Sequence, residues 1–209
     1  MKYNRLLTDK DREALQFRVD EMIKYCPEMM NRKISRANVQ QAFVLDTVYN
    51  YIGDEDPRIL CIGCFDDTAY ESLLVQRYDI EGIDPEINHD LKTYYDKFSE
   101  EKEDIIFATS VLEHVHDDEE FMSYFCDLLK PNGIGILTMD FNNDYKDGDS
   151  VPDTVIRQYT KYDLEVRLMN VLSKYGCKLV DNPNWNGEPD FVHQGHLYSF
   201  ATLVFKKDA

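Results

Sequence analysis

Apolar residues recur along this chain at two spacings, one typical of amphipathic helices and one typical of buried strands. Helical spacing predicts helices over residues 8–24, 38–52, 68–76, 117–129 and 160–175. Short continuous apolar runs, several rich in Ile, Val or Phe, predict strands over residues 59–62, 81–84, 104–110, 134–141, 178–180 and 197–205. From residue 59 onward, strands and helices alternate.

This alternation indicates an α/β fold in which a largely parallel sheet has helices on both faces. A chain of 209 residues fits one such domain, and no internal repeat or domain boundary interrupts it. In such sheets ligands bind beyond the carboxyl ends of the strands. That rule brings residues 63–67, Asp84, residues 110–116, residues 140–144 and the start of the loop 181–195 to one rim.

The clearest chemical signal lies in the first strand, its turn and the next strand. Gly63 follows the apolar strand and lets the backbone approach a ligand at the start of the next helix. Asp84 ends the second strand, 21 positions after Gly63. A carboxylate about 20 residues beyond such a turn is suited to hold a ribose diol. The pattern therefore predicts a nucleotide-cofactor site.

The composition of the chain limits the classes of partner that it is expected to bind. Asp and Glu number 40 against 23 Lys and Arg, giving a net charge of −17, which disfavours nucleic acid and anionic membranes. No run of about 20 apolar residues suggests a membrane span, and residues 1–10 lack a signal peptide's apolar segment. Five cysteines, several within apolar runs, fit a reducing cytoplasm. Zinc or redox use of Cys61 and Cys64 is disfavoured because Cys61 lies within the predicted strand.

Several segments, in this order, resemble the class I S-adenosylmethionine-dependent methyltransferases. Residues 59–65 (ILCIGCF) stand where that family has its glycine-rich motif, and residues 82–84 (GID) where it has its ribose-binding acid. Residues 104–115 (DIIFATSVLEHV) and 128–133 (LLKPNG) resemble its fourth-strand motif and the approach to its fifth strand. The resemblance implies a Rossmann-like, mostly parallel seven-stranded sheet with an antiparallel last strand.

The resemblance also implies a single methyltransferase domain over residues 1–209. Residues 1–52 would be an N-terminal helical cap, residues 58–141 the cofactor-binding half and residues 142–209 the substrate-side half. The implied cofactor is S-adenosylmethionine, with S-adenosylhomocysteine as product. The residues expected to bind it are Gly63, Cys64, Phe65, Asp84, Pro85, Asp90, Leu91, Ser110 and Val111, with Asp90 and Leu91 at the adenine.

The chain departs from the family pattern in three places. Cys61 stands where the family usually has an acid, which removes a partner for the methionine ammonium group. Phe65 and Asp67 stand where it has glycines, so side chains crowd the turn. Between Asp84 and Asp104 the chain is too short for the usual helix, strand and helix, which predicts a shortened crossover.

His114, His193 and Asp140 are the candidate catalytic residues. His114 closely follows a strand end and can act as base or positioning group, since histidine titrates near neutral pH; packing at a helix start is its alternative role. Asp140 can bind acceptor hydroxyls or simply form a turn. His193, like His196, can reach the site from the long loop or face solvent. His116 and Asp117 rank next, and no spacing indicates a metal site.

The predicted function is transfer of a methyl group to a small polar acceptor by an enzyme of the EC 2.1.1 class. Oxygen is the predicted acceptor atom, with nitrogen as the second choice. The tail of the chain resembles small bacterial methyltransferases of surface-polysaccharide synthesis. That likeness suggests a sugar, sugar phosphate or nucleotide-sugar acceptor from capsule or lipopolysaccharide synthesis. Two alternatives stay open: a non-catalytic S-adenosylmethionine-binding module and a nicotinamide oxidoreductase. A homodimer is also left open.

Overall fold

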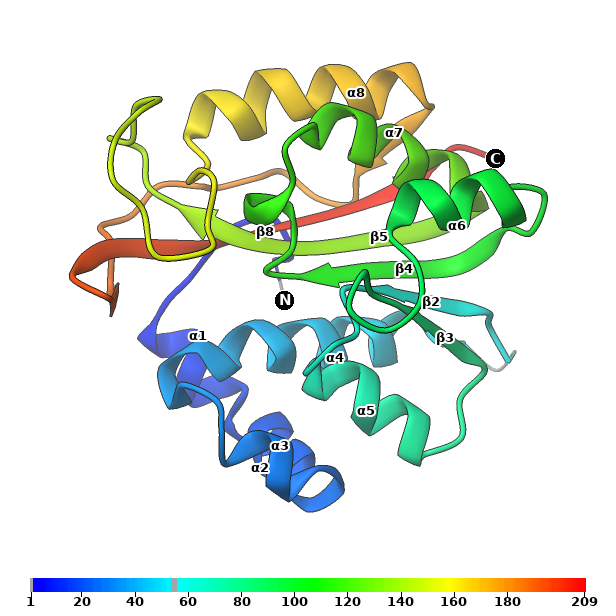
Figure 1. Cartoon of the computed structure of the whole chain (residues 1–209), viewed down its shortest axis with the longest axis horizontal. Coiled ribbons are helices and arrows are strands. Elements are labelled where there is room, and N and C mark those ends of the chain that lie inside the picture. The colour runs from blue at the N-terminus through cyan, green and yellow to red at the C-terminus, as the bar shows by residue number, and fades with distance from the viewer. Residues whose placement is uncertain (1, 54–55) are drawn as a thin grey trace.

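A computed structural model describes residues 2–53 and 56–209. Of the N-terminal residues 1–10, only Met1 lies outside the described residues. A central sheet separates two helical layers (Figure 1). One layer holds α6 (Leu91–Phe98), α7 (Asp118–Leu128) and α8 (Leu168–Lys174). The other holds α1 (Asp9–Ala14), α2 (Gln16–Tyr25), α3 (Pro27–Met30), α4 (Val39–Tyr51) and α5 (Thr68–Val75). The α/β architecture expected from the alternating pattern is confirmed.

The sheet order along its main path is β1-β8-β5-β4-β2-β3, with β6 and β7 also paired to β8. The strands are β1 (Leu6–Leu7), β2 (Ile59–Ile62), β3 (Ile80–Ile83), β4 (Glu103–Thr109), β5 (Leu129–Phe141), β6 (Cys177–Leu179), β7 (Phe191–His193) and β8 (His196–Lys207). The pairs β2·β3, β2·β4 and β4·β5 are parallel, whereas β8 is antiparallel to each of its partners. The reversed last strand is therefore confirmed.

The expected count of seven strands is wrong: the described residues form eight. The family's strand between β3 and β4 is missing, because only α6 fits there, as the shortened crossover predicted. Two strands that were not predicted, β1 and β7, bring the number of strands among the described residues to eight. They and β6 pair in turn with successive parts of β8, which is too long for one short partner. This covers hydrogen-bonding groups that an open edge would expose.

Alternation along the parallel strands divides the core between the two faces. In β2, Leu60 and Ile62 pack toward α6 and α7, whereas Ile59 and Cys61 pack toward α4 and α5. All four side chains are buried, as the continuous apolar run predicted. Cys61 therefore lies in the core, and burial raises the pKa of its thiol well above the ordinary value. A buried protonated thiol is a poor metal ligand or nucleophile.

Two predicted elements, the strand at 134–141 and the helix at 160–175, differ in detail in the structure. The strand expected at residues 134–141 begins earlier, at Leu129, and contains a large bulge: Leu129 pairs with Glu103 and Ile134 with Ile105, so the intervening residues have no pairing partner in β4. The helix expected at residues 160–175 does form, and it begins with a capping box in which Thr160 N–H donates to Asp163 Oδ2 at 2.8 Å and Asp163 N–H donates to Thr160 Oγ1. Its first part, η3 (Asp163–Arg167), is π-helical.

Two short 3₁₀ segments complete the chain, η1 (Ser35–Asn38) and η2 (Leu112–His114). Among residues 2–53 and 56–209, no helix combines the length and apolar character needed to cross a bilayer.

Candidate functional site

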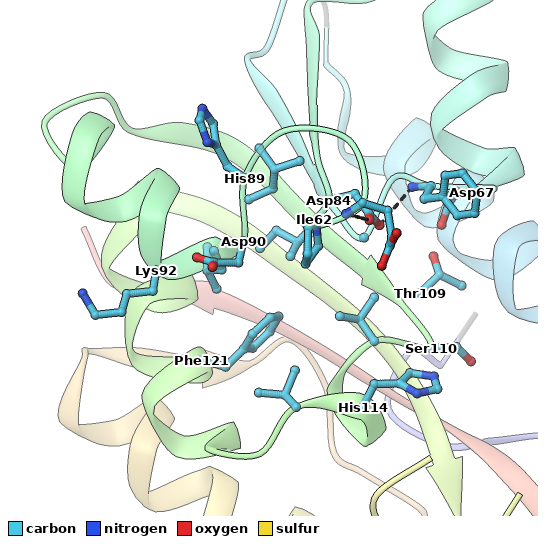
Figure 2. A pocket seen from close by; sticks show the side chains of 18 of the residues that line it. Ile62, Asp67, Asp84, His89, Asp90, Lys92, Thr109, Ser110, His114 and Phe121 are labelled. Atoms are coloured by element: carbon cyan, nitrogen blue, oxygen red, sulfur yellow. Dashed lines mark hydrogen bonds between the residues drawn. The ribbon is translucent and has the colours of Figure 1, made fainter. Parts of the chain in front are cut away.

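A cavity of about 1110 Å³ opens at the carboxyl ends of β2, β3 and β4, where the parallel sheet places it. Figure 2 shows Asp84, Asp90, Phe121 and His114 around one hollow, although they come from four different segments. Apolar side chains such as Ile62, Leu91 and Phe121 form much of its wall. An apolar wall with a few polar groups is the usual composition of a small-molecule site.

The turn after β2 is built around Gly63. Its φ of 81° lies in the left-handed region, and a Cβ there would lie 2.4 Å from Val111 Cγ2. The N–H groups of Gly63 and Cys64 both donate to the Ile83 carbonyl, which fixes the turn against β3. Glycine is therefore required at this position, and it allows Val111 to approach the backbone closely.

Asp84 sits at the end of β3 and lines the cavity. Its Oδ2 accepts a hydrogen bond from Phe65 N–H at 3.2 Å, and its Oδ1 accepts one from Glu86 N–H at 2.9 Å. The carboxylate therefore connects the turn after β2 with the loop after β3. Each oxygen accepts only one bond from the described residues, which leaves acceptor capacity facing the cavity.

The turn after β2 contains a buried acid, Asp67, at a position where the family usually has a glycine. Asp67 is 3% exposed, and its Oδ1 caps α5 by accepting from Tyr70 N–H at 2.9 Å. Its Oδ2 is buried without a hydrogen-bond partner of good geometry, as is the nearby Thr109 Oγ1 at the end of β4. Both residues line the cavity. Burial raises the pKa of Asp67, despite hydrogen bonds that lower it.

The opposite wall begins at α6. Asp90 caps this helix, with Oδ1 accepting from Thr93 N–H at 2.6 Å, and that bond lowers its pKa. Leu91 follows as the first helical residue and is buried against the core. The pair therefore offers one carboxylate and one apolar side chain to the same cavity.

The loop after β4 carries Ser110 and His114. Ser110 adopts a φ of 52°, unusual for a residue other than glycine, and its Oγ donates to Gln40 Oε1 at 2.9 Å. His114 Nδ1 lies 2.8 Å from the Thr154 carbonyl. A carbonyl can only accept, so Nδ1 carries the proton and Nε2 of the neutral ring keeps its lone pair. His114 is thus able to take up a proton.

A second, smaller cavity of about 190 Å³ adjoins the first through Ser110, His114 and Thr154, which line both. Asp140 and His193 line only the small cavity. Of the nine residues expected to bind a cofactor, eight line the large cavity. These are Gly63, Phe65, Asp84, Pro85, Asp90, Leu91, Ser110 and Val111. The exception is Cys64, whose side chain is buried in the core.

Sequence reasoning missed several residues of these cavities. Lys33 and Thr109 line the large one and Glu113 the small one, and Asp67 was interpreted only as crowding the turn. Glu113 belongs to the motif over residues 104–115, but nothing in the sequence marks it as 1% exposed. Thr109 ends a buried strand on the rim side, which was a usable signal.

Two neighbouring acids at the start of α7, Asp117 and Asp118, have different roles. Asp117 caps α7 by accepting from Glu120 N–H. Asp118 is buried and forms a bidentate pair with Arg167, both bonds at 2.7 Å, while Tyr159 Oη donates to it at 2.8 Å. That network joins α7 to η3 and serves the fold, not the cavities.

Across residues 2–53 and 56–209, no three His, Cys, Asp or Glu side chains are grouped so as to hold a metal ion.

Comparison with known proteins agrees with this geometry. A family profile described as "Methyltransferase domain" matches residues 21–182, well over half of the chain. No curated protein shows a matching sequence.

Three solved structures illustrate the similarity of fold. The Burkholderia thailandensis 1,6-didemethyltoxoflavin-N1-methyltransferase, solved with bound 1,6-didemethyltoxoflavin and S-adenosylhomocysteine, is 17% identical with a TM-score of 0.53, over 98% of this chain and 92% of that one. A SAM-dependent methyltransferase from Archaeoglobus fulgidus is 13% identical with a TM-score of 0.55, over 80% and 94%. The [4+2]-cyclase SpnF is 15% identical with a TM-score of 0.54, over 100% and 99%. Because one of these is a cyclase, similarity of fold alone does not determine the reaction.

Proposed function

The chain belongs to the methyltransferase domain family, and we propose that it is an S-adenosylmethionine-dependent methyltransferase that modifies an oxygen of a small polar acceptor. The observation that carries the proposal is the large cavity at the carboxyl ends of β2, β3 and β4. It combines the Gly63 turn with the buried Asp84 carboxylate, the two features that a nucleoside cofactor requires at such a rim.

The residues of the cavity fit this cofactor. Asp84 would hold the ribose hydroxyls with its remaining acceptor capacity. Asp90 would accept from the adenine amino group, and Leu91 and Phe121 would pack on the ring, since both line the same wall. These assignments place a carboxylate opposite the ribose hydroxyls and another opposite the adenine amino group, and apolar side chains against the ring.

The amino-acid end of the cofactor has a partner in Asp67, in place of the acid that Cys61 replaces. Asp67 Oδ2 and Thr109 Oγ1 are buried polar atoms on that side of the cavity, and neither forms a hydrogen bond of good geometry with the described residues. An ammonium group would satisfy both, and an ionised carboxylate that is unpaired in the free protein becomes paired on binding. Lys33, which also lines the cavity, would attract the cofactor's carboxylate.

When bound, the cofactor supplies a sulfonium-activated methyl group, so the protein's task is to place an acceptor oxygen in line with it and remove a proton. His114 lies between the two cavities, and its free Nε2 makes it our proposed base. His193 reaches only the small cavity and would position the acceptor. General-base assistance of this kind is worth roughly 10²–10⁴-fold in rate.

The acceptor would occupy the small cavity, where the pocket is continuous with the methyl-donor side. The proposed acceptors are a sugar, a sugar phosphate or a nucleotide-sugar of capsule or lipopolysaccharide synthesis in the cytoplasm, a class suggested by the sequence resemblance. The division into a helical cap over 1–52 and halves over 58–141 and 142–209 stays a prediction, as does a homodimer.

Isothermal titration calorimetry with S-adenosylhomocysteine, with NADH as comparison, tests the cofactor. We expect binding of S-adenosylhomocysteine at micromolar concentration and none of NADH; the reverse would favour an oxidoreductase. Methyl-labelled S-adenosylmethionine incubated with cell metabolites then tests transfer. Binding without incorporation into any acceptor would favour a non-catalytic binding module.

A further inference from the structure

The small cavity is lined by two buried carboxyl groups, Glu113 and Asp140. Glu113 in η2 is 1% exposed and Asp140 near the end of β5 is 4% exposed. Glu113 Oε1 accepts from Asp140 N–H at 3.3 Å, whereas Oε2 has no partner among the described residues. An unpaired buried carboxylate oxygen costs free energy unless a ligand or a proton satisfies it.

No cation compensates this pair. No Lys or Arg lines the small cavity, and neither carboxyl forms an ion pair anywhere in residues 2–53 and 56–209. The other titratable groups that line the small cavity are Asp153, the imidazoles of His114 and His193, and Tyr198, which lowers the pKa of Asp140. Burial raises the pKa of both carboxyls, and the charge of Glu113 raises that of Asp140 further. Two adjacent buried carboxyls repel each other when both are ionised, which disfavours the doubly charged state.

The rest of the cavity favours a small ligand with a polar end. Phe191 and Phe200 form an aromatic wall, with ring centroids 4.6 Å apart. The carboxyl pair supplies several hydrogen-bond acceptors and a net negative charge at the other side. A phosphate or carboxylate placed here would meet like charge in a poorly solvated space, whereas hydroxyl or amino groups would find acceptors.

We propose that Glu113 and Asp140 form the acceptor-binding pair, and that they select a small molecule with hydroxyl or amino donors and without phosphate or carboxylate. The inference rests on the proposed methyltransferase function and narrows its acceptors from the phosphorylated sugars to unphosphorylated, neutral or cationic ones. It also assigns Glu113 a role that the sequence did not reveal.

The experiment compares wild-type protein with Glu113→Gln, Asp140→Asn and the exposed control Glu100→Gln. Three properties are measured: affinity for S-adenosylhomocysteine, the urea midpoint of unfolding, and transfer of labelled methyl to cell metabolites. For both cavity variants we expect unchanged affinity, an unchanged or higher midpoint, and at least a tenfold loss of transfer, since losing a hydrogen bond to a charged group has a cost of this order. The control should match wild type in all three.

The labelled product is then passed over an anion exchanger at neutral pH, and a parallel sample over a cation exchanger separates amines from neutral polyols. We expect the product to pass the anion exchanger unretained. Retention would overturn the proposed acceptor chemistry, and a lowered urea midpoint with full transfer would show that the pair is structural.

Loss of S-adenosylhomocysteine binding by wild-type protein would instead count against the proposed function. If wild-type protein binds S-adenosylhomocysteine but transfers no methyl group, the urea midpoints of unfolding still decide the role of Glu113 and Asp140. A cavity variant more stable than wild type supports a pair kept for a ligand, and a less stable one overturns it.

Discussion

Replacing Asp67 with Asn tests whether this buried acid is the partner of the cofactor's ammonium group. Asn caps helices as well as Asp does, so the variant preserves the start of α5. The substitution changes mainly Oδ2, which becomes an amide that can donate to Thr109 Oγ1. Charge is thus removed from the cavity with little change in shape.

Two effects of opposite sign follow. A hydrogen bond between charged groups is worth about 1.5–3 kcal/mol, so affinity for S-adenosylhomocysteine should fall roughly 10- to 150-fold. Stability should not fall. Because burial raises the folded-state pKa of Asp67 above its unfolded value, its ionised form destabilises the fold at neutral pH. Wild-type protein should gain stability relative to the Asn variant only as the pH falls through that raised value toward about 4.

Calorimetry with S-adenosylhomocysteine and urea unfolding at pH 7 measure the two effects, with the exposed Asp79→Asn as control. Unchanged affinity in the Asp67 variant would refute the ammonium assignment. Reduced affinity accompanied by an equal loss of stability would show that Asp67 serves the turn and not the cofactor.

Three further substitutions separate structure from chemistry. Asp118→Asn should cost about 3 kcal/mol in urea unfolding without changing cofactor affinity, because it breaks a buried ion pair. Burial alone would raise the pKa of Asp118, but its Arg and Tyr partners together lower it. Its stabilisation is therefore full above about pH 4 and lost as the pH falls through the lower folded value, so acid unfolding of the variant should be less steep. Gly63→Ala should lower stability by about 2 kcal/mol and weaken cofactor binding, since its Cβ would lie 2.4 Å from a neighbouring methyl carbon, whereas Gly53→Ala, with nothing within 4 Å, should do neither. His114→Gln should reduce turnover roughly 10²-fold or more with little change in cofactor affinity, while His196→Gln, outside both cavities, should retain activity; full activity of the first would exclude it as the base.

The parallel half of the fold was predictable because its signals are local. Buried strands such as β2 and β4 appear as continuous apolar runs, and the 21-residue interval from Gly63 to Asp84 follows from one strand, turn and helix. The short crossover was predictable by length alone. In contrast, β1 and β7 were missed because each is only two or three residues long and forms by pairing with β8.

The candidate site was predictable in position but not in its charges. The rule of strand ends brought Gly63, Asp84 and His114 to one cavity. It did not distinguish Asp117, an exposed helix cap, from the neighbouring Asp118, which is buried against Arg167. Nor did it identify the buried Glu113.

The sequence by itself determined the order of the elements, the glycine at the cofactor turn and the acid at the end of β3, because each depends on residues close together in the chain. The tertiary structure alone decided which acids are buried and unpaired. Asp67 meets Thr109 only when β2 and β4 are placed side by side, and Glu113 meets Asp140 only when β4 and β5 are. Burial and the absence of a counter-charge are properties of that packing, and they give these carboxyls the proposed roles in binding.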